Sequence, residues 1–250
     1  MQIVADTHVH LYPALYDSGR QLAAALANLC AAAPSAGVRI LCLTERAGQR
    51  VFADWRAGAQ SPDGWTCAPC DDPDALPLSS KTGELCLIAG RQIVSAERIE
   101  LLALGRALII PDGLPLRDTI DRVRGGDAIA ALPWGFGKWW GRRGTFVQNC
   151  IDSETPESLV FADTCLRPAG FPTPALLRTA RLRGFSILYG TDPLPRPGEE
   201  LITGRWATRW EADWDPSHPA AAWRRIIRER VPAESAGRRC SMGEALKRLR

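Results

Sequence analysis

The chain has 250 residues, 46% of them apolar and 24% charged, and a formal net charge of +3 at pH 7. These values are ordinary for a globular protein, and the charge is too small to favour nucleic acid as a partner, although it does not exclude one. No basic segment followed by a long apolar run opens the chain and no stretch has the apolar length of a membrane span, so we expect no signal peptide and no membrane partner. Eight scattered cysteines indicate reduced thiols and a cytoplasmic protein rather than a disulfide framework.

The first expected strand begins at Ile3 and ends in alternating polar residues, Asp6, His8 and His10. Side chains alternate between the two faces of a strand, so we expect these three to point the same way. Two of the three histidines in the chain lie here, and each neutral imidazole offers one nitrogen lone pair to a metal ion. The pattern predicts a metal site at the end of this strand, and the alternative is an ordinary strand with a polar end.

Apolar runs of strand length alternate with helical spacing along most of the chain. Further strands are expected at 38–43, 85–93, 99–105, 128–134, 158–163 and 185–190. Helices are expected at 18–33, 115–123, 174–183 and 223–230, the first capped by Ser18 and the third by Thr173. This alternation predicts one α/β domain over residues 1–250, a barrel of seven or eight strands. Residues 196–250, rich in Trp and Arg, are expected to pack on the barrel as an extension.

Residues 47–84 are rich in Gly, Pro and Asp and are interpreted as an irregular segment. They contain one C-x-x-C pair, Cys67 and Cys70. No second pair follows at zinc-finger spacing and no thioredoxin-like strand and helix surround it, so we interpret both as ordinary loop thiols. His218 lies away from any expected strand end and is interpreted as a surface or helix-start residue.

Residues of matching type follow the expected strands in an order that resembles the PHP (polymerase and histidinol phosphatase) superfamily of metal-dependent hydrolases. The matching residues are His8, His10, Asp163 and Asp192, with Glu45 as a partial match. The resemblance extends from residue 3 to about residue 195. It implies a distorted (β/α)7-type barrel that holds metal ions at the carboxyl ends of its strands.

Three positions depart from the family pattern. Arg46 stands where the family has an imidazole, Gln92 where it has a carboxylate that bridges metals, and Leu132 where it has a histidine before a proline. Neutral glutamine cannot bridge two cations as a carboxylate does, and leucine cannot coordinate at all. Since each metal needs three or more protein ligands, we expect at most one tightly bound divalent metal per chain, zinc or manganese.

The resemblance also implies roles for the polar residues. His8, His10 and Asp192 would hold the metal, with Asp163 as a further ligand or the general base. Glu45 is a second candidate for either role, or the partner of Arg46 beside it. Arg46 would orient an anionic substrate.

A loop at residues 135–144 combines glycines, cations and tryptophans and is expected at the rim of the site. Its cations Lys138, Arg142 and Arg143 are candidates for gripping phosphate or carboxylate, together with Gln92 from the neighbouring strand. The alternative is a solvated loop anchored by its tryptophans. These residues indicate a small anionic substrate as the partner, with a phosphate ester as the favoured kind.

Two classes of function stay open. The first is a phosphoesterase-type hydrolase with one divalent metal and weak activity. The second is a catalytically eroded PHP-like protein that binds an anionic ligand or a partner in the same cleft. A third and less favoured interpretation, an amidohydrolase with a single metal, would need histidines after the fifth and sixth strands that this chain lacks.

Overall fold

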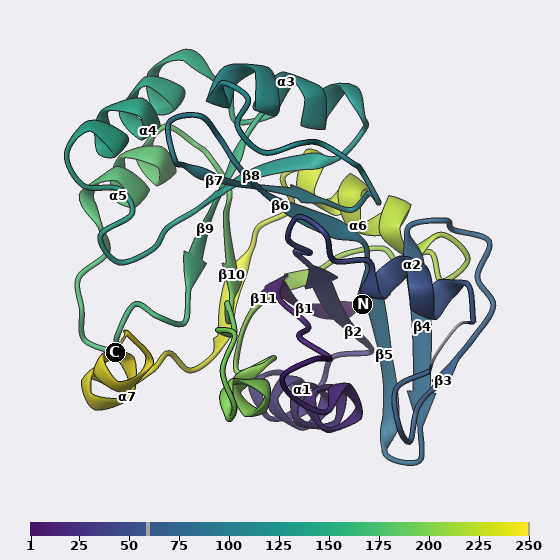
Figure 1. Ribbon diagram of the computed structural model, residues 1–250. Coiled ribbons are helices and arrows are strands. Elements are labelled where there is room, and N and C mark those ends of the chain that lie inside the picture. Colours follow the sequence, from purple (N-terminus) through teal and green to yellow (C-terminus); the bar gives the residue numbers. More distant parts are fainter. Residues whose placement is uncertain (59–60, 250) are drawn as a thin grey trace.

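The computed structural model describes residues 1–58 and 61–249, whose strands form two sheets with helices on their outer faces (Figure 1). The larger sheet contains β1 (Gln2–Val9), β2 (Val38–Leu43), β3 (Thr66–Cys67), β4 (Ala75–Ser80), β5 (Gly83–Ile88), β11 (Trp206–Glu211) and β12 (Glu234–Gly237). The smaller sheet contains β6 (Gly90–Val94), β7 (Glu100–Leu104), β8 (Ile129–Pro133), β9 (Val160–Thr164) and β10 (Ile187–Gly190). The helices are α1 (Ser18–Ala32), α2 (Val51–Arg56), α3 (Leu116–Gly125), α4 (Arg142–Ser153), α5 (Ala175–Leu182), α6 (Pro219–Arg228) and α7 (Met242–Leu249), with a 3-10 turn η1 at Glu199–Ile202.

The larger sheet has the strand order β12-β11-β1-β2-β5-β4-β3 and the smaller sheet the order β10-β9-β8-β7-β6. Strand β1 is parallel to β2 and antiparallel to β11, and β8, β9 and β10 are parallel to one another. Parallel neighbours end at the same edge of a sheet, so the polar residues that follow β1 and β2, and those that follow β9 and β10, come together in space. Within the ranges described, no helix is long and apolar enough to cross a membrane.

The inner faces of both sheets share one buried apolar cluster, which includes Ile3, Ile40 and Leu102. Trp210 of β11 and Trp223 of α6 belong to this cluster and fill it near the end where β1 begins. Helices α1 and α2 cover the outer face of the larger sheet, and α3, α4 and α5 cover that of the smaller sheet. With one end of the interior filled by tryptophans, the opposite end is left for polar side chains.

The predicted α/β class is confirmed, but the described strands do not close into the single barrel that we expected. Strand β11 pairs with Gln2–Ala5 in the first half of β1 and takes the edge that β10 would need. Strand β10 and the residues directly after it join only the second half, through individual hydrogen bonds such as those from Thr7 Oγ1 to Tyr189 O (3.0 Å) and from Asp192 N to His8 O (2.9 Å). On the other side, β2 approaches β6 through an isolated bridge between Glu45 and Arg91. The ladder of strands is therefore interrupted where the two sheets meet.

Several elements lie outside the expected set. The segment 47–84 is not irregular throughout, because it contains α2, β3 and β4. Helix α4 begins inside the expected loop at 135–144, and β11 and β12 follow the strand that was expected to be last. Strand β4 contains Pro77, and a proline inside an apolar run argues against a strand in the sequence. Strand β11 pairs with β1, about two hundred residues away, so its pairing leaves no pattern in the neighbouring sequence.

The helix expected at 223–230 begins earlier, since α6 covers Pro219–Arg228. The expected caps of α1 and α5 are displaced by one residue. Asp17 caps α1 in place of Ser18, and its Oδ1 accepts hydrogen bonds from Gly19 N (2.7 Å) and Arg20 N (3.3 Å). Helix α5 follows Pro174 without any side-chain cap, so Thr173 does not cap it. Such shifts are small and leave the faces of both helices unchanged.

Candidate metal centre

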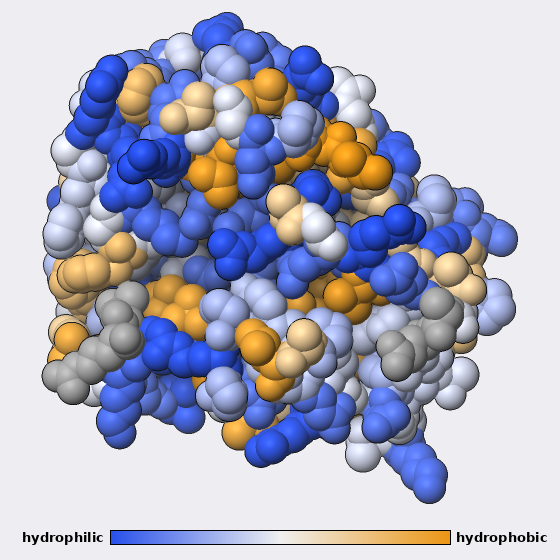
Figure 2. Space-filling view, in the orientation of Figure 1, coloured by the Kyte–Doolittle hydropathy of each residue, from blue (hydrophilic) through white to orange (hydrophobic). Residues whose placement is uncertain are grey.

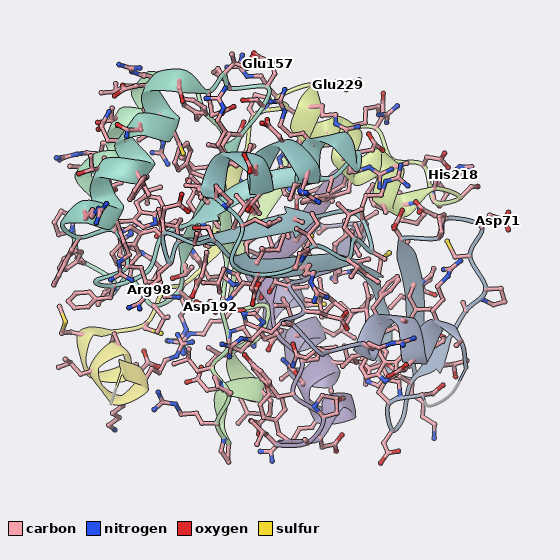
Figure 3. All side chains as sticks on the ribbon, turned by 45° about the horizontal axis from the view of Figure 1, so that its top comes forward. Asp71, Arg98, Glu157, Asp192, His218 and Glu229 are labelled. Atoms are coloured by element: carbon pink, nitrogen blue, oxygen red, sulfur yellow. The ribbon has the colours of Figure 1, made fainter. Side chains whose placement is uncertain are left out.

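Three buried side chains from two distant segments converge at the end of β1. His8 Nε2 and His10 Nε2 each lie 3.5 Å from Asp192 Oδ1, and one ligand atom from each residue lies within 4.8 Å of the others. The three residues are 1%, 3% and 6% exposed. Figure 3 shows Asp192 inside the molecule and His218 at its periphery. In the orientation of Figure 1, hydrophilic residues cross the middle of the visible face (Figure 2).

Asp192 is fixed from both sides of its backbone. It follows β10 with a φ of 51°, a conformation that is uncommon outside glycine. Its N–H donates to His8 O, and its carbonyl accepts a hydrogen bond of 2.9 Å from Arg248 Nη2 in α7. Gly190 permits this approach, since a Cβ there would lie 2.6 Å from His8 N and 2.7 Å from His8 Cβ.

Asp6 does not join the two histidines, contrary to our expectation. The register between β1 and β2 shifts between Asp6 and Val9, and Val4 and Val9 pack in the same outer cluster although five positions separate them. Such an irregularity reverses the alternation of side chains. Asp6 therefore turns away from the site.

The carboxylate of Asp6 holds the backbone that surrounds the site. It accepts hydrogen bonds from Thr191 N (2.9 Å), Gly204 N (2.8 Å) and His8 N (3.2 Å), and also from the Thr191 hydroxyl. Burial raises the pKa of Asp6 to about 6, although these hydrogen bonds lower it. Asp6 thus ties β1 to the segment after β10 and to the turn before β11.

The electrostatics of the three converging residues suit a cation. Neither ring nitrogen of His8 has a hydrogen-bond partner among the described residues, although both are buried. Burial lowers the pKa of His8 to about 4, so its imidazole is neutral at neutral pH. Burial alone would raise the pKa of Asp192, but the charge of His8 and the hydrogen bond to His10 hold it below its ordinary value. Neutral imidazoles and a carboxylate are the forms that bind a metal, so the donors fit a divalent ion.

The structure does not bring Asp163 or Glu45 into this group. Both carboxylate oxygens of Asp163 accept from Arg167, including two bonds of 3.0 Å from Arg167 Nε, and both side chains are buried. Glu45 is half-buried and its Oε1 accepts a hydrogen bond of 2.8 Å from Phe52 N in α2. Among the described residues, the group of donors that could hold a metal contains His8, His10 and Asp192, and neither of these two carboxylates.

Arg46 and Gln92 lie together beside the site. They line a cavity of about 330 Å³ that Tyr12 also lines, and the ring centroid of Tyr12 is 5.6 Å from that of His10. Leu132 is fully buried in the apolar cluster behind the smaller sheet and leaves no donor in the site.

The cations of residues 135–144 divide between two places. Lys138 Nζ lies 2.6 Å from Glu100 Oε2, and the charges of both groups act on His8. Arg142 and Arg143 line a separate cavity of about 460 Å³ with Glu97 and Phe146. The structure therefore places Lys138 near the site and the two arginines away from it.

The sequence did not predict two residues that lie close to the candidate metal centre. Glu100 at the start of β7 lacked a motif, and Arg248 appeared only as part of a basic tail. The sequence did contain a signal for α7, because Ser241 and Glu244 form a capping box. Nothing local indicates that α7 then turns Arg248 toward Asp192.

Comparison with known proteins gives a likeness in structure alone. No family model matches the sequence, and no curated protein matches it. PsfC from Pseudomonas syringae PB-5123 has a TM-score of 0.62 at 14% identity, over 99% of this chain and 95% of PsfC. The lesion-specific endonuclease PfuEndoQ from Pyrococcus furiosus has a TM-score of 0.54 at 10% identity, over 94% of this chain and 58% of the endonuclease. Endonuclease Q in complex with a 27-mer duplex substrate gives 0.52 at 11%, with the same coverage. The chain therefore shares the fold of these proteins.

Proposed function

We propose that this chain is a PHP-like, metal-dependent hydrolase that acts on a phosphate ester with one divalent metal and low turnover. The observation that carries this proposal is the convergence of His8, His10 and Asp192, with both buried nitrogens of His8 lacking any partner among the described residues. Leaving such atoms without a partner is unfavourable unless a ligand completes the site. Zinc or manganese fits two imidazoles and a carboxylate.

The chain's own residues supply the positioning. His8, His10 and Asp192 would hold the ion, which when bound lowers the pKa of water and so provides a nucleophile near neutral pH. Thr44 Oγ1 lies 3.5 Å from His10 Nδ1 and orients the ring from behind. Lys138, paired with Glu100, lies close enough to act on the charges of His8 and Asp192 and would attract an anionic ester.

A catalytically eroded protein that binds an anionic ligand in the same cleft is the second candidate. The ion pair of Asp163 with Arg167 favours it, because that pairing removes a carboxylate from the possible ligands. Gln92 and Leu132 provide no anionic ligand either. These residues argue against a site with several metals, and they leave a single metal with three protein donors.

Elemental analysis of the purified protein separates the two candidates. We expect about one zinc or manganese per chain, and its loss in the His8→Ala/His10→Ala variant. His218→Ala is the matched control, because His218 is exposed and lies at the surface in a pair with Asp215 (3.1 Å).

The activity screen should include small phosphate monoesters and a DNA substrate with an abasic lesion, since Endonuclease Q has been solved with such a duplex. Metal-dependent turnover of either substrate supports the hydrolase. Absence of bound metal after incubation with zinc and with manganese would favour the eroded site.

A further inference from the structure

We propose that the cavity between Tyr12, Arg46 and Gln92 is a subsite for a second anionic group of the substrate, a phosphate or a carboxylate. This inference rests on the proposed function, because it places the subsite beside the group that would hold the metal. The cavity has a volume of about 330 Å³, and its lining comes from the segments after β1 and β2, from β6 and from the segment between β7 and α3. The Tyr12 ring, which lies against His10, joins the cavity to the metal centre.

Gln92 is the buried anchor of this cavity. The residue is only 7% exposed and lines the cavity from β6. Its backbone is fixed there, because its N–H donates to Glu45 O over 2.9 Å. The neutral amide group offers two N–H donors to an oxyanion in the cavity.

Arg46 supplies the positive charge in the lining of this cavity. Its guanidinium forms no ion pair with any carboxylate in the described part of the chain, unlike the paired arginines Arg106, Arg167 and Arg248. Gln49 fixes the turn that carries it, since Gln49 Oε1 accepts from Arg46 N (2.7 Å) and Gln49 Nε2 donates to Leu11 O (3.2 Å). Burial raises the pKa of Tyr12, whereas the charge of Arg46 and a hydrogen bond from it lower that pKa, so the guanidinium faces Tyr12 across the cavity.

Asp112 is the one carboxylate in the lining. Its Oδ1 accepts a hydrogen bond of 2.9 Å from Val94 N, which anchors it to β6. A planar guanidinium and an amide N–H match the two or three oxygens of a compact oxyanion, and such charge-assisted bonds are among the stronger ones in proteins. Since this subsite adjoins the metal centre, the anionic group belongs to the same molecule as the ester at the metal.

The test measures binding of inorganic phosphate and of malonate by calorimetry, with protein from which metal has been removed by a chelator. We expect Arg46→Gln to weaken phosphate binding at least about tenfold, and Gln92→Leu to weaken it by a similar factor. Arg142→Gln is the matched control, because this exposed arginine lines a different cavity. A preference for phosphate or for malonate identifies which oxyanion the subsite takes.

The two proposals fail in different ways. His8→Ala/His10→Ala should lose metal and keep phosphate binding, whereas Arg46→Gln should keep metal and lose phosphate binding. If Arg46→Gln and Gln92→Leu bind phosphate as the wild type does, or if neither anion binds the wild type, the subsite does not exist. If the double histidine variant loses metal and still binds phosphate, that result supports the subsite even where the assay for phosphate-ester hydrolysis finds no activity.

Discussion

Arg248 in the last helix donates from Nη2 to the backbone carbonyl of Asp192 over 2.9 Å, across 56 positions of sequence. The same guanidinium binds the Glu199 carboxylate through Nε (2.9 and 3.0 Å) and reaches Cys240 Sγ with Nη1 (3.1 Å). Arg248 and Glu199 are both buried, so this pairing is held away from solvent. Helix α7 thereby supports the backbone of a proposed metal ligand.

Replacing Arg248 should weaken the metal centre. Lysine keeps the charge but cannot bind Glu199 and the Asp192 carbonyl together, so we expect Arg248→Lys to reduce metal affinity about tenfold. Competition with a chromogenic chelator measures the affinity. Lys247→Ala is the control, because this neighbouring side chain is exposed. Equal affinities in Arg248→Lys and wild type would show that the carbonyl needs no such support.

Gly190→Ala should separate β10 from β1. The new Cβ would lie 2.6 Å from the backbone nitrogen of His8, so the strands must move apart. We expect a loss of unfolding free energy of about 1–3 kcal/mol and weaker metal binding. Gly125→Ala in α3 is a matched control with nothing within 4 Å of its new Cβ, and it should be neutral or stabilising by up to about 1 kcal/mol. Chemical denaturation measures both variants.

Asp163 should contribute to stability and not to metal binding. Asp163→Asn leaves the buried Arg167 without its charge partner, which costs about 3–5 kcal/mol in comparable buried pairs. The double variant Asp163→Asn/Arg167→Met should recover much of that free energy, because both buried charges are then removed. Metal content should be unchanged in both variants. A fall in metal content in Asp163→Asn, with the fold intact by circular dichroism, would return Asp163 to the ligand set.

The start of α7 should loosen in acid. The Ser241 N–H and the Arg205 guanidinium both bind the Glu244 carboxylate and lower the pKa of Glu244 to about 2, from 4.5. A carboxyl group with a lowered folded pKa adds stability above its unfolded pKa and loses it as the pH falls. We therefore expect α7 to become more accessible to hydrogen exchange between about pH 4.5 and pH 2. Glu244→Gln should show the higher exchange already at pH 7 and little change below it.

The sequence alone determined the α/β class, most strand positions and three candidate metal donors. His8 and His10 could be found because the spacing of two residues on a strand is a local property, and Asp192 because it ends a strand in a Gly-Thr-Asp turn. The convergence of all three was confirmed by the distances between their ligand atoms. Local periodicity is enough for such donors, since parallel strands bring their carboxyl ends together.

Only the tertiary structure decided which of the other polar residues are free. The irregular register of β1 turned Asp6 away from the histidines, Arg167 took both oxygens of Asp163, and Glu45 was used by the first turn of α2. The barrel is open because β11, which lies beyond residue 200, pairs with one edge of β1. Each outcome depends on a contact between parts of the chain whose approach no local pattern encodes, because burial and pairing are properties of the folded surroundings rather than of the residue type.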